Sequence, residues 1–268
     1  RKKACALSWR SASQPGSAIS QSPAHGGAIV DFTGKIVVIT GGGGGWGRTV
    51  VEAFLTANAS VVVVERPSVA ETMDAWKQGL GERGGRLSCV AGDVLDEASV
   101  EQMMQQVLDQ HGRLDVLVNI VGGFTMGQPV SDLPLETWEH MMNLNLRSTF
   151  LCSKYASHPM MQQRWGRIIN ISSRSAVQPS PKAAAYAVSK AGVIALTETQ
   201  AAELKDYSVT VNAIVPSIVD TPANRQAMPN ADFSRWPRGE EIASVILFLA
   251  SEEAKLISGA AIPVYGQA

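Results

Sequence analysis

The feature that most constrains the fold of this chain is a regular alternation of short β-branched runs with longer segments of helical spacing. The runs that favour strands lie at residues 36–40, 61–65, 87–91, 116–119, 168–172, 209–215 and 261–264. Helical spacing is found at residues 46–58, 70–79, 97–110, 136–161, 183–205 and 240–250. Strands that alternate with helices form parallel sheets covered on both faces. The pattern therefore predicts a doubly wound α/β fold with a seven-stranded parallel sheet and helices on both faces.

Composition changes once along the chain, near residue 30. Residues 1–30 carry four basic residues and no acidic ones, and they have no apolar periodicity. We expect them to form a disordered or poorly packed N-terminal tail, and residues 31–268 to form a single domain, because no linker interrupts the alternation. A basic, acid-free start is also typical of an organellar transit peptide, so a cytoplasmic location is expected unless the tail is such a signal.

Charge, hydropathy and cysteine usage exclude several classes of protein. The balance of 23 basic and 24 acidic residues leaves a net charge of -1, which offers no basic field for nucleic acid. No apolar run reaches the roughly 18 residues of a membrane-spanning helix. Cys5, Cys89 and Cys152 form no CxxC pair and have no histidine at metal-ligand spacing. We therefore expect neither a disulfide framework nor a bound metal.

A run of glycines directly follows the first predicted strand. Thr40 leads into residues 41–47, which are all glycine except Trp46, and a predicted helix begins there. Glycine lets a backbone turn tightly and approach a ligand closely, and the N–H groups and dipole of a helix start attract phosphate. The run fits both G-x-G-x-x-G and T-G-x-x-x-G-x-G, so it does not choose its own register. It predicts a Rossmann-type dinucleotide site, with a flexible glycine loop as the alternative.

The second predicted strand ends in Glu65, about 20 residues after the glycines, where a carboxylate can accept hydrogen bonds from the adenosine ribose hydroxyls. That position favours NAD(H). Arg66 follows immediately and can instead pair with a 2′-phosphate, so NADP(H) stays open. A charged strand end without a binding role is the alternative for both residues.

Tyr186 and Lys190 lie four residues apart in a segment rich in alanine. On a helix, residues at i and i+4 project from the same face, so a cation can lie beside the phenol. A nearby positive charge lowers the pKa of a tyrosine toward the range in which it exchanges protons at neutral pH. The pair alone is weak evidence, because tyrosine and lysine at this spacing are common on surface helices.

Together these motifs resemble the short-chain dehydrogenase/reductase family. The likeness covers residues 32–268 and includes Ser173, thirteen residues ahead of Tyr186 at the end of a predicted strand. It implies that the glycine turn, the ends of the later strands and the segment after the sixth strand bind the nicotinamide cofactor. The implied cofactor-binding residues are Gly41, Gly45, Trp46, Gly47, Glu65, Asp93, Val94, Asn119, Gly122, Tyr186, Lys190, Pro216, Ile218 and Thr221.

The resemblance also assigns catalytic roles. Tyr186 would be the general acid in reduction and the base in oxidation, and Lys190 would lower its pKa and bind the nicotinamide ribose. Ser173 would hydrogen-bond the substrate oxygen. Asn145 would hold a water that connects Lys190 to solvent, and we prefer it to Asn143 because the residues that follow it match the family pattern.

The substrate is expected at the carboxyl ends of the strands, between residues 122–130, 174–181 and 217–236. These walls supply apolar side chains, namely Phe124, Met126, Val177, Met228, Phe233 and Trp236. We therefore expect an apolar or aromatic ketone or secondary alcohol, with residues 222–237 as a mobile lid. Core packing of the same side chains is the alternative.

Two other functions stay open at this point. One is reduction of a 3-oxoacyl group on acyl-carrier protein, which needs a basic docking patch, and Arg147, Lys182 and Arg225 are scattered candidates. The other is a non-catalytic NAD(P)-binding regulator. The joint presence of Asn145, Ser173, Tyr186 and Lys190 argues against it, because a binding module does not need that set. From the resemblance and the apolar segments 136–161 and 183–205, we expect a homotetramer or homodimer.

Overall fold

A computed structural model describes residues 30–70 and 72–267 of the chain. The predicted tail, residues 1–30, lies outside the described residues except for its last one. The prediction that residues 31–268 form a single domain stays a prediction, although all the strands named below belong to one sheet.

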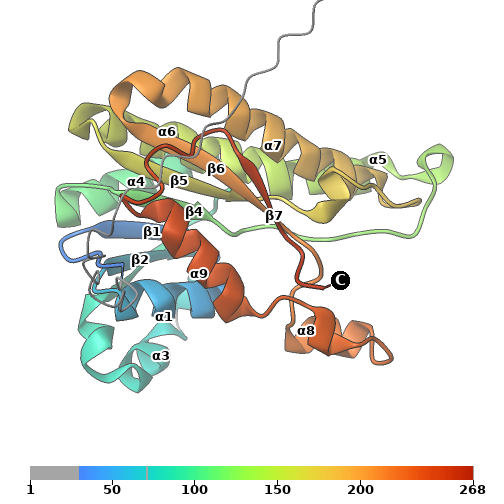
Figure 1. The fold of residues 1–268 in the computed structure, drawn as a ribbon, viewed down its shortest axis with the longest axis horizontal. Helices are drawn as coiled ribbons and strands as arrows, with labels where there is room; N and C mark the ends of the chain where they lie inside the picture. The colour runs from blue at the N-terminus through green and yellow to red at the C-terminus, as the bar shows by residue number, and fades with distance from the viewer. Residues whose placement is uncertain (1–29, 71, 268) are drawn as a thin grey trace, which may run out of the picture.

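Seven parallel strands form the sheet (Figure 1). They are β1 (Ile36–Thr40), β2 (Ser60–Glu65), β3 (Leu87–Ala91), β4 (Val116–Asn119), β5 (Gly166–Ile171), β6 (Val209–Pro216) and β7 (Ala261–Val264). Their order across the sheet is β3-β2-β1-β4-β5-β6-β7, and every neighbouring pair is parallel. The predicted fold class is confirmed, and each strand lies within two residues of its predicted bounds.

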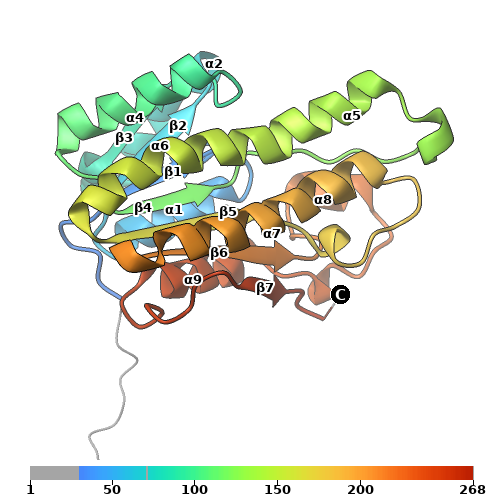
Figure 2. The same ribbon diagram turned by 90° about the horizontal axis from the view of Figure 1, so that it is seen from above.

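Helices cover both faces of the sheet, as Figures 1 and 2 show. One face carries α1 (Gly47–Thr56), α3 (Met73–Gly79) and α9 (Gly239–Ala250), and the other carries α4 (Glu97–His111), α6 (Ser148–Gln163) and α7 (Ala184–Leu204). Shorter helices are α2 (Pro67–Ala70), α5 (Leu135–Met141) and α8 (Pro222–Ala227). None of the helices in the described ranges combines the length and apolar character needed to cross a bilayer.

The side chains of each strand alternate between the two helical layers, because successive residues of a strand point to opposite faces of the sheet. In β1, Val37 and Ile39 join the core beneath α1 and α9, whereas Ile36 and Val38 join the core beneath α4 and α6. All of these side chains are buried. Continuous β-branched runs were therefore a reliable signal for strands buried on both faces.

The helix predicted over residues 136–161 is not uniform. It begins as α5, passes through a π-helical turn at Met142–Arg147 and continues as α6 to Gln163. A π-helical turn contains one residue more than an α-helical turn, and such turns occur frequently at functional sites. Asn145 lies within this turn.

The strand order reverses between β1 and β4, which creates a crevice at their carboxyl ends where ligands of doubly wound sheets bind. Thr40 and Asn119, the last residues of these strands, are paired across the sheet. The Thr40 hydroxyl accepts hydrogen bonds from the backbone N–H groups of Ile120 and Val121, at 3.1 and 3.4 Å. The glycine turn after β1 and the loop after β4 are therefore tied together at the start of the crevice.

Candidate active site

The glycine turn bends sharply between β1 and α1. Gly41 has a φ of 72°, a left-handed conformation that favours glycine. A Cβ at Gly47 would lie 2.4 Å from the carbonyl oxygen of Gly41, closer than atoms can approach. A Cβ at Gly45 would meet nothing within 4 Å, so that side of the turn is open to a ligand. The turn thus combines a closely packed interior with an open backbone surface that suits a diphosphate.

Glu65 lies beside this turn at the end of β2. Its Oε1 accepts a hydrogen bond of 2.8 Å from the backbone N–H of Gly43. The guanidinium Nε of Arg48 donates to the carbonyl oxygen of Gly43 at 2.9 Å, so the turn is held from both sides. The carboxylate is thereby fixed at the predicted position of the adenosine ribose, whereas Arg66 is exposed.

The other residues predicted to contact the adenosine half of the cofactor differ in their exposure to solvent. Asp93 is exposed beyond the end of β3, where its carboxylate accepts from the backbone N–H two residues further on at 2.9 Å. Val94 is buried. The Asn119 side chain is also buried, and its Nδ2 donates to Ser153 and Asn170 at 3.0 and 2.8 Å. The Asn119 amide is therefore engaged inside the protein.

Ser173 and Tyr186 meet at the carboxyl end of β5. Ser173 lies in the loop after that strand, and Tyr186 lies in the first turn of α7. Burial raises the pKa of Tyr186, and the neighbouring Ser173 hydroxyl acts in the opposite direction. The net shift is upward, whereas the sequence reasoning expected Lys190 to lower it. The ring of Phe124 lies edge-on to Tyr186, with 4.9 Å between ring centroids.

Lys190 is buried one turn further along α7, with 4% of its surface exposed. Its Nζ donates to the backbone oxygen of Ile171 at 2.8 Å, and the Ser172 hydroxyl donates to the backbone oxygen of Lys190 at 2.8 Å. Burial lowers the pKa of Lys190 to about 8, because a charged ammonium is poorly solvated there. The ammonium group is therefore held at a fixed place at some cost in stability.

That cost predicts the effect of Lys190→Met on folding. The folded-state pKa lies below the value of 10.5 for an exposed lysine, so the charged form destabilises the fold at neutral pH by up to about 3 kcal/mol. We expect Lys190→Met to raise the melting temperature of the ligand-free protein at pH 7. The difference from wild type should shrink as pH rises from 8 to above 10.5. Calorimetry against pH measures this, with the exposed Lys255→Met as control; equal effects of the two variants would contradict the prediction.

Asn145 connects the π-helical turn to the loop after β4. It is fully buried, whereas Asn143 is exposed. Its Oδ1 accepts from the backbone N–H of Gly123 at 2.8 Å, and its Nδ2 donates to the Gly123 oxygen at 3.1 Å. The same Nδ2 donates to the Ser189 hydroxyl at 3.0 Å. Sequence reasoning missed Ser189, although it stands between Tyr186 and Lys190 in the segment already singled out.

Gly122 lies against two of these groups. A Cβ added there would come within 2.8 Å of the Asn145 Oδ1 and 3.0 Å of the Lys190 Nζ. The loop after β4 thus passes close to both side chains only because residue 122 has none of its own.

A cavity of about 440 Å³ joins the glycine turn to the segment after β6. Its lining includes Gly45 and Trp46 from the turn, Thr49 from α1 and Thr221. Thr221 also caps α8, since its hydroxyl accepts from a backbone N–H at 3.2 Å. Pro216 is buried at the end of β6, and Ile218 is exposed. This cavity, the open face of the glycine turn and the placement of Glu65 together fit an extended dinucleotide.

The segment predicted as a mobile lid is folded and held by side chains. It contains α8, and Arg225 pairs with Asp220 through two hydrogen bonds of 2.6 and 2.7 Å. Arg225 also lies over the ring of Phe233, whose centroid is 5.0 Å from that of Trp236. Trp236 is buried, so it packs within the lid, contrary to the expectation that it lines the pocket. Phe124, by contrast, is 61% exposed.

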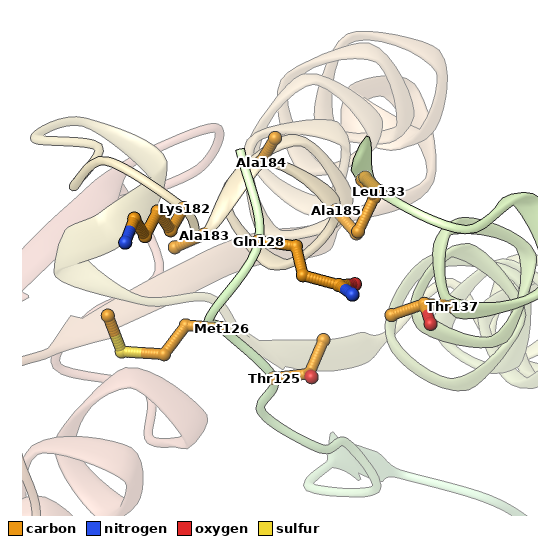
Figure 3. Close-up of a pocket in the computed structure, with 9 residues that line it drawn as sticks. All are labelled: Thr125, Met126, Gln128, Leu133, Thr137, Lys182, Ala183, Ala184 and Ala185. Carbon is orange, nitrogen blue, oxygen red and sulfur yellow. The ribbon is translucent and has the colours of Figure 1, made fainter. Parts of the chain in front are cut away.

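A second, smaller cavity of about 80 Å³ lies between the loop after β4, α5 and the start of α7. Polar side chains from the loop and α5 line it, and Gln128 extends across it toward Thr137, whereas Lys182 points away (Figure 3). Ala185, the residue before Tyr186, forms part of its floor. A small recess of mixed polar and apolar lining thus adjoins the site.

A doubly wound sheet with a dinucleotide crevice and a Ser-Tyr-Lys cluster defines a nicotinamide-dependent oxidoreductase. The family model for short chain dehydrogenase matches residues 35–232. A 3-oxoacyl-[acyl-carrier-protein] reductase of Synechocystis sp. is 36% identical over 228 residues, 83% of this chain and 92% of the relative. Galactitol 2-dehydrogenase of Rhizobium johnstonii is 36% identical over 244 residues, 86% of this chain and 93% of that protein.

The likeness extends to solved structures. The structure of ElxO with NADP bound is 29% identical, with a TM-score of 0.80 over 87% of this chain and 97% of that one. This chain belongs to the short-chain dehydrogenase/reductase family. It is therefore an NAD(P)-dependent oxidoreductase that acts on CH–OH donors or the corresponding carbonyls.

Proposed function

We propose that this protein transfers hydride between a nicotinamide cofactor and a ketone or secondary alcohol, with Tyr186 as general acid and base. The observation that carries the proposal is that Ser173 and Tyr186 come together at the carboxyl end of β5, with Lys190 buried one turn further along the helix of Tyr186. Two hydroxyl groups so placed can both reach one substrate oxygen. Lys190, buried one turn away on the same helix, supplies a fixed positive charge.

In the reductive direction, Tyr186 would give its proton to the carbonyl oxygen as negative charge develops there. Its raised pKa keeps the phenol protonated at neutral pH, which suits a proton donor. Ser173 would stabilise the same oxygen by a hydrogen bond. The bound cofactor supplies or accepts the hydride. Asn145 would hold the loop after β4 against α7 through Gly123.

We further propose an apolar or aromatic substrate. Phe124, Met126, Val177 and Ile218 are exposed on the loops that follow β4, β5 and β6, and Phe124 touches Tyr186. Exposed apolar side chains grouped around a crevice favour apolar ligands. A panel of aryl ketones, aliphatic ketones, keto-sugars and their alcohols, followed by absorbance of the reduced nicotinamide, tests this. Aryl ketones should turn over fastest; a clear preference for keto-sugars would overturn the assignment.

Reduction of 3-oxoacyl groups on acyl-carrier protein is the second candidate, favoured by the 36% identity to the Synechocystis reductase. It requires basic residues that dock the acidic carrier protein. Arg147 and Lys182 are exposed, but Arg225 is already paired with Asp220. Adding a 3-oxoacyl thioester to the panel, both free and bound to the carrier protein, separates the two candidates. Only the acyl-carrier-protein reductase is expected to turn over the carrier-bound thioester faster than the free one.

For the cofactor, we propose a preference for NADH over NADPH of about tenfold or more in affinity. The Glu65 carboxylate beside the glycine turn can accept from ribose hydroxyls but repels a 2′-phosphate. Glu65→Ala should weaken NADH binding and reduce the preference, and fluorescence titration with both cofactors measures this. The exposed Glu101→Ala is the control. Equal affinities of wild type for NADH and NADPH would contradict the role of Glu65. The test discriminates because ElxO, a structural relative, has NADP bound.

We propose a homotetramer or homodimer in the cytoplasm. Phe150 on α6 and Val188 on α7 are exposed on one side of the sheet, and Phe248 on α9 is exposed on the other. Exposed apolar side chains favour association. Sedimentation velocity at micromolar concentration should give a dimer or tetramer. Phe150→Glu should shift the distribution toward smaller species if α6 contributes. A monomer in wild type would refute the proposal.

A further inference from the structure

The hydroxyl of Ser189 joins two parts of the site that are far apart in sequence. Ser189 is fully buried on α7, between Tyr186 and Lys190. Its Oγ donates to the backbone oxygen of Tyr186 at 2.8 Å. The same Oγ accepts from the Nδ2 of Asn145 at 3.0 Å, across 44 positions of sequence. One small side chain thus connects the π-helical turn with the turn of α7 that carries the tyrosine and lysine.

The Asn145 side chain requires the Ser189 hydroxyl as an acceptor, because its other hydrogen-bonding groups already have partners. Its Oδ1 accepts from Gly123, and its Nδ2 donates once to Gly123 and once to Ser189. A side-chain amide carries two N–H donors, so these bonds satisfy both. Among the described residues, the one further acceptor near this nitrogen is the Met141 sulfur at 3.8 Å, and a thioether is a weak acceptor.

The orientation of the Asn145 amide matters for its neighbours. A Cβ added at Gly122 would come within 2.8 Å of the Asn145 Oδ1 and 3.0 Å of the Lys190 Nζ, so the Gly122 backbone packs beside both groups. If the Asn145 amide turned, its two bonds to Gly123 would break. The neighbouring backbone of Gly122, which lies beside the Lys190 Nζ, would then be free to move. Interiors are closely packed, so a displacement at one of these groups is passed to the next.

We propose that Ser189 is a positioning residue for the reaction: it holds the Asn145 amide in one orientation and so fixes Gly122 and Lys190 relative to Tyr186. The inference rests on the proposed roles of Tyr186 and Lys190. Ser189 itself touches neither substrate nor cofactor in this scheme, and it acts through Asn145.

Ser157 offers a matched comparison. It is buried on α6, donates to the backbone oxygen of Ser153 at 2.6 Å and accepts from the Gln200 Nε2 at 2.8 Å. Ser157→Ala and Ser189→Ala therefore remove the same atoms and the same two kinds of bond. Both should lower stability to a similar extent, because each leaves an amide donor without its hydroxyl acceptor.

The experiment compares both variants in the full chain by thermal melting, steady-state kinetics and the ¹H–¹⁵N signals of the asparagine side chains. We expect Ser189→Ala alone to lower kcat by about tenfold, with KM changed by less than about twofold. Its pH profile of kcat should also move, and the Asn145 amide signal should shift. Ser189→Thr, which keeps the hydroxyl, should recover most of the rate.

Several outcomes would overturn the proposal. One is a Ser189→Ala variant whose kcat and pH profile match those of Ser157→Ala. If Ser189→Ala does not fold, Ser189→Cys replaces it, and full turnover with an unchanged pH profile in that variant has the same meaning. If wild type turns over no carbonyl, the proposed function fails. The amide spectrum still decides whether Ser189 holds the Asn145 side chain in place. An Asn145 signal that does not respond to Ser189→Ala refutes the positioning role in either case.

Discussion

Tyr186→Phe is expected to lower kcat by about a thousandfold while leaving cofactor affinity within about twofold of wild type. The substitution removes one oxygen atom, and the ring keeps its edge-on contact with Phe124. It removes the only group for which we propose proton transfer to the substrate oxygen. General acid and base catalysis typically contributes about 10² to 10⁴ in rate. Turnover, cofactor titration and a melting curve measure the three effects separately.

Tyr207→Phe is the matched control, because its ring lies at the surface in the 3-10 turn after α7. It should leave all three quantities unchanged. Full turnover in Tyr186→Phe would show that the proton comes from elsewhere. A loss of cofactor affinity as large as the loss of kcat would indicate a binding role for the hydroxyl instead.

Gly47→Ala is expected to destabilise the protein by at least about 3 kcal/mol. The new Cβ would lie 2.4 Å from the carbonyl oxygen of Gly41, a backbone atom that cannot move without opening the glycine turn. For a domain of this size, that loss corresponds to a fall in melting temperature of about 6 to 12 °C. Because the turn forms the predicted phosphate cradle, cofactor should no longer restore the lost stability.

Gly45→Ala separates folding from binding in the same turn. Its Cβ would meet no protein atom within 4 Å, so the melting temperature of the ligand-free protein should stay within about 2 °C of wild type. A methyl group on the open side of the turn should still weaken cofactor binding, since it stands where a phosphate would approach. If both variants melted alike, the close contact at Gly47 would not be what limits the turn.

The sheet could be predicted from sequence because its signal is local. A strand buried on both faces favours apolar β-branched residues at nearly every position, and β1 and β2 meet that requirement with runs of valine and isoleucine. Two family motifs then located Ser173, Tyr186 and Lys190. The structure brings Ser173 and Tyr186 together at the end of β5 and buries Lys190 one turn away from Tyr186.

The features that could not be predicted depend on how deeply a side chain is buried and on contacts between segments that are distant in sequence. The direction of the Tyr186 pKa shift is set by how deeply the phenol is buried, which no local pattern reveals. Ser189 was overlooked because its partner, Asn145, lies 44 positions earlier. Trp236 was assigned to the pocket because an aromatic residue on a loop has the same composition signal whether it faces a ligand or packs on Phe233.

The π-helical turn also means that the helix changes phase at Asn145. Successive residues of an α-helix are rotated by about 100°, so the extra residue in Met142–Arg147 turns the face of α6 by that angle relative to α5. Deleting one residue there would restore an ordinary helix but swing Leu151, Cys152 and Ala156 off the sheet. Substitutions along this helix should therefore be tolerated far better than a change of a single residue in its length.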